Sequence, residues 1–71
     1  MNAPEWLAAY AEKLGMPAPT KDELTAVLDL TAEAAHSSQR IAGPLAVWLA
    51  ARAGVSLDEA LRLAKEVVAD S

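Results

Sequence analysis

Apolar residues recur at helical spacing in four stretches of the chain, with short polar or proline-containing segments between them. The stretches run from about residue 3 to 14, 21 to 37, 44 to 53 and 57 to 69. Within each stretch the apolar side chains stand three or four positions apart, so they share one face of an α-helix. The first stripe contains Trp6, Leu7, Tyr10 and Leu14. The pattern therefore predicts four short helices.

Residues that begin and end helices stand at the boundaries of these stretches. Three pairs have the spacing of a capping box, in which side chain and backbone bond reciprocally: Asn2 with Glu5, Thr20 with Glu23, and Ser56 with Glu59. Gly15 and Gly54 suit the left-handed position that closes a helix. Pro44 suits the first position of the third helix, where a missing N–H costs nothing.

Short loops between these helices predict one all-α domain over residues 1–71, a compact antiparallel-type bundle of four short helices. We expect the bulk of the core to come from the three aromatic side chains, Trp6, Tyr10 and Trp48. Three other apolar side chains lie off the main stripes and either broaden the core or form an exposed patch that a partner covers: Leu30, Val47 and Leu63.

The amino-acid composition favours helices and excludes several classes of function. Ala and Leu, which favour helix, provide 17 and 10 of the 71 residues, whereas Ile occurs once and Phe is absent. Without Cys there is no disulfide, no thiolate metal site and no cysteine nucleophile, and a single His excludes two-His metal motifs. A net charge of −4 disfavours binding to nucleic acid or to an anionic membrane.

The ends and the apolar runs indicate no targeting or membrane segment. The N-terminal residues include an early acid and a proline rather than a basic start with a long apolar stretch. The longest uncharged run, residues 41–51, has 11 residues, whereas a membrane span needs about 20. We therefore expect a cytoplasmic protein.

The carboxylates and hydroxyls do not indicate a catalytic site. The pairs Asp22/Glu23 and Asp58/Glu59 each fall in the first turn of a predicted helix, where capping and the helix dipole explain them. Ser37 adjoins His36, but consecutive helical positions point about 100° apart, so they do not form a nucleophile and base. We expect no enzyme, no cofactor and no metal.

The segment that joins the second and third helices carries the candidate ligand or partner site. Its residues are His36, Arg40, Gly43, Pro44 and Leu45. On a continuing helix the first two share a face, which in the simplest interpretation is a solvated face. Alternatively, they supply positive charge beside the unpaired N–H groups that open the third helix and bind phosphate or carboxylate there. The third interpretation is a protein-binding surface.

The same segment resembles a small bacterial helical domain of unknown function that occurs alone or fused to molybdenum-cofactor guanylyltransferases. The residues that match are Trp6, Leu14, Gly15, Leu28, Asp29, Leu30, Glu33, Ala35, His36, Arg40, Pro44 and Leu45. Thr31 and Ile41 depart from the pattern, which has Ala and Pro there. The resemblance implies an accessory role near the synthesis of molybdopterin guanine dinucleotide, with such a transferase as protein partner.

These observations favour a non-catalytic helical module that acts by binding a protein. Two other hypotheses stay open: a small anion or nucleotide ligand at the junction of the second and third helices, and a self-associating structural protein, since short bundles gain stability from oligomerisation.

Overall fold

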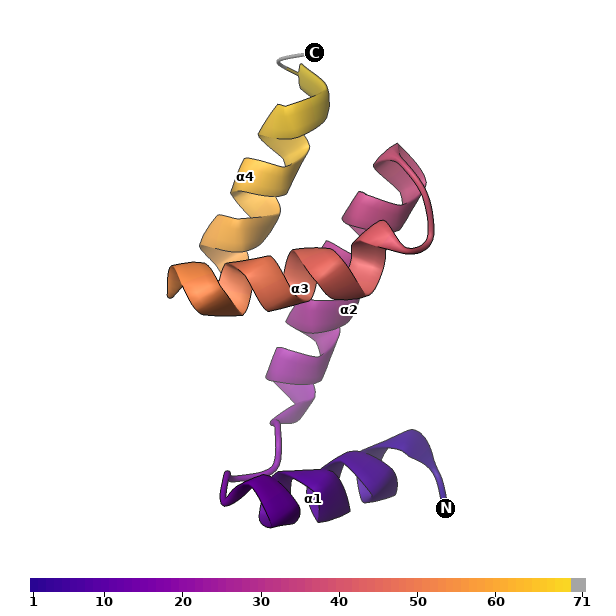
Figure 1. The fold of residues 1–71 in the computed structure, drawn as a ribbon, viewed down its shortest axis with the longest axis vertical. Helices are drawn as coiled ribbons and strands as arrows, with labels where there is room; N and C mark the ends of the chain where they lie inside the picture. The colour runs from indigo at the N-terminus through magenta and orange to yellow at the C-terminus, as the bar shows by residue number, and fades with distance from the viewer. Residues whose placement is uncertain (70–71) are drawn as a thin grey trace.

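The chain forms four helices over residues 1–69, the part that the computed structural model describes (Figure 1). They are α1 (Ala3–Leu14), α2 (Lys21–Ser37), α3 (Ala42–Ala53) and α4 (Leu57–Ala69). The described residues contain no strand. The predicted all-α helical bundle is therefore confirmed.

Helix α2 is the centre of the fold. Both α3 and α4 pack on it, and α1 lies across the foot of α2, at the other end of the molecule (Figure 1). α3 crosses α2 steeply instead of running antiparallel to it, so α4 leaves α3 in the direction in which α2 runs. The molecule measures 40 × 23 × 18 Å, and its radius of gyration of 13.0 Å exceeds the value of about 11 Å usual for this length.

The capping residues define α1 as the sequence indicates. The Glu5 amide donates to Asn2 Oδ1 at 2.9 Å, and the Asn2 amide donates to the Glu5 carboxylate at 3.3 Å. Gly15 closes the helix with φ at 72°, and the next amide, that of Met16, donates to the Ala11 carbonyl at 2.9 Å. This left-handed closure turns the chain into the segment with Pro17 and Pro19, which cannot extend the helix.

Helix α3 begins two residues before the predicted start at Pro44. Ala42 opens the helix, and the proline lies within its first turn. The amides of the first turn have no partner inside the helix, so a proline there removes no helical hydrogen bond. The sequence pattern therefore could not distinguish the first position from the third.

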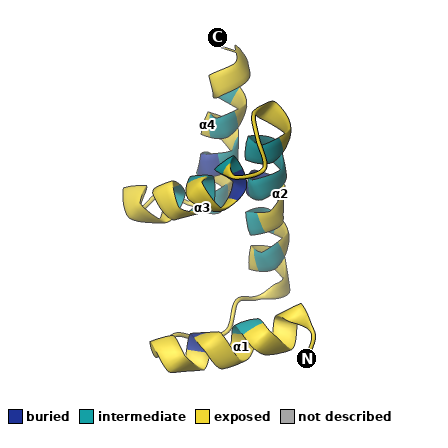
Figure 2. Ribbon diagram, turned by 45° about the vertical axis from the view of Figure 1, so that its right-hand side comes forward, coloured by how far each residue is buried: buried dark blue, intermediate teal, exposed yellow. Residues whose placement is uncertain are grey.

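The core is small. Within residues 1–69, three apolar side chains are buried, Ala11, Leu30 and Ala60, and Leu30 is the largest of them at 2% exposure. Figure 2 shows that the buried and half-buried surface follows the contacts of α2 with α3 and α4, whereas α1 is nearly all exposed. The Leu30 side chain, from the second half of α2, is thus the main buried side chain where the helices pack together.

The aromatic side chains do not form the core, contrary to the sequence-based prediction. Trp6, Tyr10 and Trp48 are each about half exposed. The rings of Trp6 and Tyr10 stack on one another along α1, with centroids 5.1 Å apart. Periodicity identified the apolar stripe of α1 correctly, but α1 packs too little against the other helices to bury it.

Helices α2 and α3 are in close contact at Gly43, which is buried. A Cβ atom at this position would lie 2.8 Å from Cγ2 of Thr31. The Thr31 side chain is itself held, because its hydroxyl donates to the Val27 carbonyl at 2.8 Å. The crossing therefore needs glycine for space rather than for backbone freedom.

We expect Gly43→Ala to lower the free energy of unfolding by about 1–2 kcal/mol, since the cost of overpacking exceeds the gain in helix propensity. Thr31→Ser removes the clashing methyl and keeps the hydroxyl. The double variant should recover more than half of the loss. Urea unfolding followed by circular dichroism measures this coupling. A Gly43→Ala protein as stable as the parent would contradict the close crossing.

Candidate functional site

An apolar groove of about 640 Å³ is formed by the C-terminal half of α2 together with α3 and α4. Its larger apolar side chains are Leu30, Leu45, Leu49, Val55, Leu63, Val67 and Val68. Leu30 is buried, but Leu45, Leu49 and Val67 are all more than half exposed. The groove is thus lined with apolar surface that no other part of the described chain covers.

Alanines explain why this region is hollow. Seven of them line the groove: Ala34, Ala42, Ala46, Ala50, Ala53, Ala60 and Ala64. Short side chains let the helices approach where they cross, yet leave space unfilled between α2, α3 and α4. Figure 1 shows α4 rising on the same side of α3 as the C-terminal half of α2.

The polar groups at the edge of the groove are occupied within their own helix. Ser38 Oγ donates to the Ala34 carbonyl at 2.7 Å, and Ser37 Oγ donates to the Glu33 carboxylate at 3.5 Å. These local bonds reduce the tendency of the hydroxyls to bind a polar ligand. The surface therefore suits an apolar partner better than a charged one.

The five residues that the sequence indicated do not form one cluster. Leu45 lines the groove, and Gly43 is buried at the crossing with α2. His36, Arg40 and Pro44 are exposed and do not line the groove. α2 ends at Ser37, so the helix that was to place His36 and Arg40 on one face does not continue.

The start of α3 is also less available to an anion than the sequence suggested. The Ala42 amide donates to the Gln39 carbonyl at 3.0 Å, and the Gly43 amide donates to the Arg40 carbonyl at 3.1 Å. Pro44 has no N–H at all. Three of the first backbone positions of α3 therefore offer no donor, and the anion hypothesis keeps little support.

Arg52 near the end of α3 has an aromatic partner. Its guanidinium carbon lies 4.8 Å from the centre of the Trp48 ring. The observed cation–π contact places the charge on the exposed ring.

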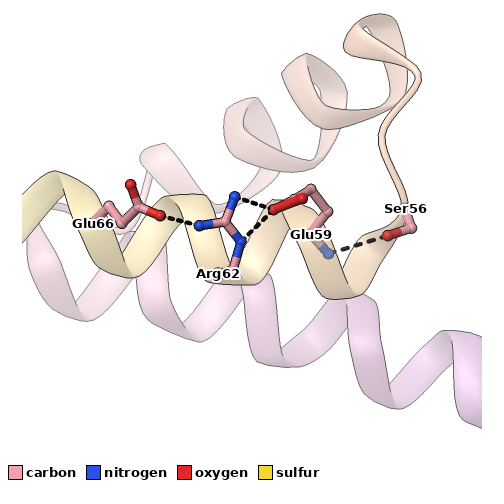
Figure 3. A network of polar contacts seen from close by, with 4 residues as sticks. All are labelled: Ser56, Glu59, Arg62 and Glu66. Carbon is pink, nitrogen blue, oxygen red and sulfur yellow. Dashed lines mark hydrogen bonds and ion pairs between the residues drawn. The ribbon is translucent and has the colours of Figure 1, made fainter.

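A chain of charged side chains runs along a separate face of α4 (Figure 3). Arg62 binds the carboxylates of Glu59 and Glu66, and the Glu59 amide donates to Ser56 Oγ at 3.1 Å. The capping box predicted here is thus half formed in the described structure, because the Glu59 carboxylate binds Arg62. This network makes one face of α4 polar, while Leu63 and Val67 give the groove face.

Other kinds of site find no support in the described residues. A smaller hollow between α2 and α4 is lined by Asp22, Asp29 and Asp58 among others. No group of three potential ligands in residues 1–69 is placed to hold a metal ion. No polar or charged side chain in that range is buried. None of the helices described is long and apolar enough to cross a membrane.

The groove was only partly foreseeable from the sequence. Leu63 was singled out as an off-stripe residue that either broadens the core or forms a patch that a partner covers, and it lines the groove. Val55 and the alanines gave no separate signal, because the groove combines residues from three helices whose crossing angles the sequence does not state.

Comparison with known protein families gives a match over the chain. The model of a protein family described as "Domain of unknown function (DUF6457)" matches residues 1–71. Neither a search of curated proteins nor a search of solved structures gave any match.

Proposed function

The chain belongs to the DUF6457 family, and we propose that it acts as a non-catalytic helical module that binds a helix of a protein partner in its apolar groove. The observation that carries the proposal is the groove itself, about 640 Å³ in volume and lined by exposed Leu and Val side chains. Amphipathic helices commonly bind in such grooves through anchors spaced three or four residues apart.

The non-catalytic part of the proposal has separate support. General acids, bases and nucleophiles act in sites that withdraw them from water and tune them. All titratable side chains of residues 1–69 keep contact with solvent. Among the described residues, the groove is lined by no His and by one carboxylate, Glu33, which accepts a hydrogen bond from Ser37. Binding is therefore a better use of this surface than chemistry.

We propose a cytoplasmic molybdenum-cofactor guanylyltransferase as the partner. The support is the resemblance of the sequence, above all Leu28, Leu30, His36 and Arg40, to a domain fused to such transferases. Leu30 and Leu45 from the matching segment also line the groove, so part of the resemblance falls on the proposed docking surface.

Co-purification of the tagged full chain with the transferase tests this function. We expect Val67→Glu to weaken the association at least about tenfold, because it places a charge among apolar groove residues. Lys65→Gln changes the net charge by the same amount on an exposed position of α4 outside the groove, and should bind as the parent does. Failure of the parent to associate at high micromolar concentration would contradict this choice of partner.

A further inference from the structure

The chain exposes far more surface than a folded monomer of its size. Its accessible area is 5619 Å², whereas a monomer of 7.4 kDa exposes about 4,200 Å². The difference is about 1,400 Å² for each chain, or about 2,800 Å² for a pair, which lies in the range of obligate homodimers. The excess thus has the size of one dimer interface.

Two separate surfaces account for much of the exposed apolar area. One is the groove. The other is the apolar stripe of α1, where Trp6, Tyr10 and Leu14 are each about half exposed. The stripe is a convex helix face with aromatic anchors, and the groove is a concave surface of Ala, Leu and Val. The same chain therefore carries both halves of a helix-in-groove contact.

The positions of these surfaces favour a second copy. α1 lies at the foot of α2, whereas the groove uses residues 30–38 of α2 and lies towards the other end (Figure 1). If a second chain is turned end over end about a two-fold axis, each α1 meets the groove of the other chain. Both contacts then form at once, which closes the dimer.

We infer that the groove is occupied by helix α1 of a second copy of this chain, in a reciprocal two-fold dimer. The inference rests on the proposed function, since it names an occupant of the same groove. Pro17 and Pro19 keep the linker between α1 and α2 out of both helices, so α1 stands apart from the groove of its own chain. A transferase helix that binds the groove takes the place of α1.

Sedimentation of full-length variants tests the arrangement. Tyr10→Glu charges the stripe of α1, and Val67→Glu charges the groove; both positions are exposed in the single chain, so its fold does not depend on them. We expect the parent and Lys65→Gln to sediment as dimers and each Glu variant as a monomer. An equimolar mixture of the two Glu variants should dimerise again, because one α1–groove contact stays intact.

The mixture separates this dimer from other pairings. If two grooves faced each other, Tyr10→Glu would stay dimeric; if each α1 folded onto its own groove, the parent would be a monomer. Either result, or a mixture that stays monomeric, would overturn the inference. The proposed function would still be supported if the parent co-purified with the transferase and Val67→Glu did not. A failure of the dimer is therefore distinguishable from a failure of the proposed function.

Discussion

Leu30→Ala should lower the free energy of unfolding by about 2–5 kcal/mol, the range for removing a fully buried leucine. Leu30 is 2% exposed and is the largest buried side chain of the described fold. A domain of this size has a total stability on the order of 5–10 kcal/mol, so the loss is a large part of it. Thermal and urea unfolding followed by circular dichroism at helical wavelengths measure the change.

Leu28→Ala is the matched control, because it removes the same atoms from the same helix. Leu28 is 64% exposed, so its truncation should cost less than about 1 kcal/mol. Equal losses in the two variants would mean that α2 presents another face to α3 and α4. The sequence pattern had placed Leu28 on the main stripe of this helix and Leu30 off it.

Thermal stability should depend strongly on protein concentration. If the folded unit is a dimer, raising the concentration about a hundredfold stabilises it by about 2.7 kcal/mol at 25 °C. For a folded unit of this combined size the Tm should rise by roughly 5–15 °C. The measurement is circular dichroism melting at both concentrations, with the path length adjusted.

Val67→Glu should abolish this concentration dependence, whereas Lys65→Gln should keep it. The first substitution charges the groove, and the second changes charge on an exposed position of α4 outside it. A parent protein whose Tm is the same at both concentrations has a monomeric folded unit, and that result would contradict the dimer.

Local features of the sequence predicted the helices well. Asn2 with Glu5 and Thr20 with Glu23 form the reciprocal capping boxes expected of them, and Gly15 and Gly54 adopt the left-handed conformation. These signals act over three to five residues, so they depend little on the tertiary fold. The start of α3 was placed two residues too late, at Pro44 instead of Ala42, because a proline is accepted anywhere in a first helical turn.

Packing between helices was not predictable in the same way. A hydrophobic stripe shows which face of a helix avoids water, but not whether another helix of the same chain covers it. Trp6 and Trp48 were therefore assigned to a core in which the structure does not place them. Gly43 had been read as a helix break, and its role at the crossing with Thr31 became visible only in three dimensions.

In the candidate site, too, local features were predictable from the sequence and the packing between helices was not. The junction residues were singled out for their charge and spacing, yet α2 ends at Ser37 and Arg40 no longer follows His36 on one helical face. Leu45 alone of those five residues lines the groove. The groove depends on the steep crossing of α3 over α2, and the crossing angle cannot be predicted from the sequence pattern.

Isotope-filtered nuclear Overhauser spectra of a mixture of labelled and unlabelled chains test the central claim, that α1 of one copy fills the groove of another. Cross-peaks should join the methyl groups of Leu63 and Val67 in labelled chains to the ring protons of Trp6 and Tyr10 in unlabelled chains. Contacts between these groups within a single chain, or a spectrum of the concentrated mixture with no contact between chains, would contradict it.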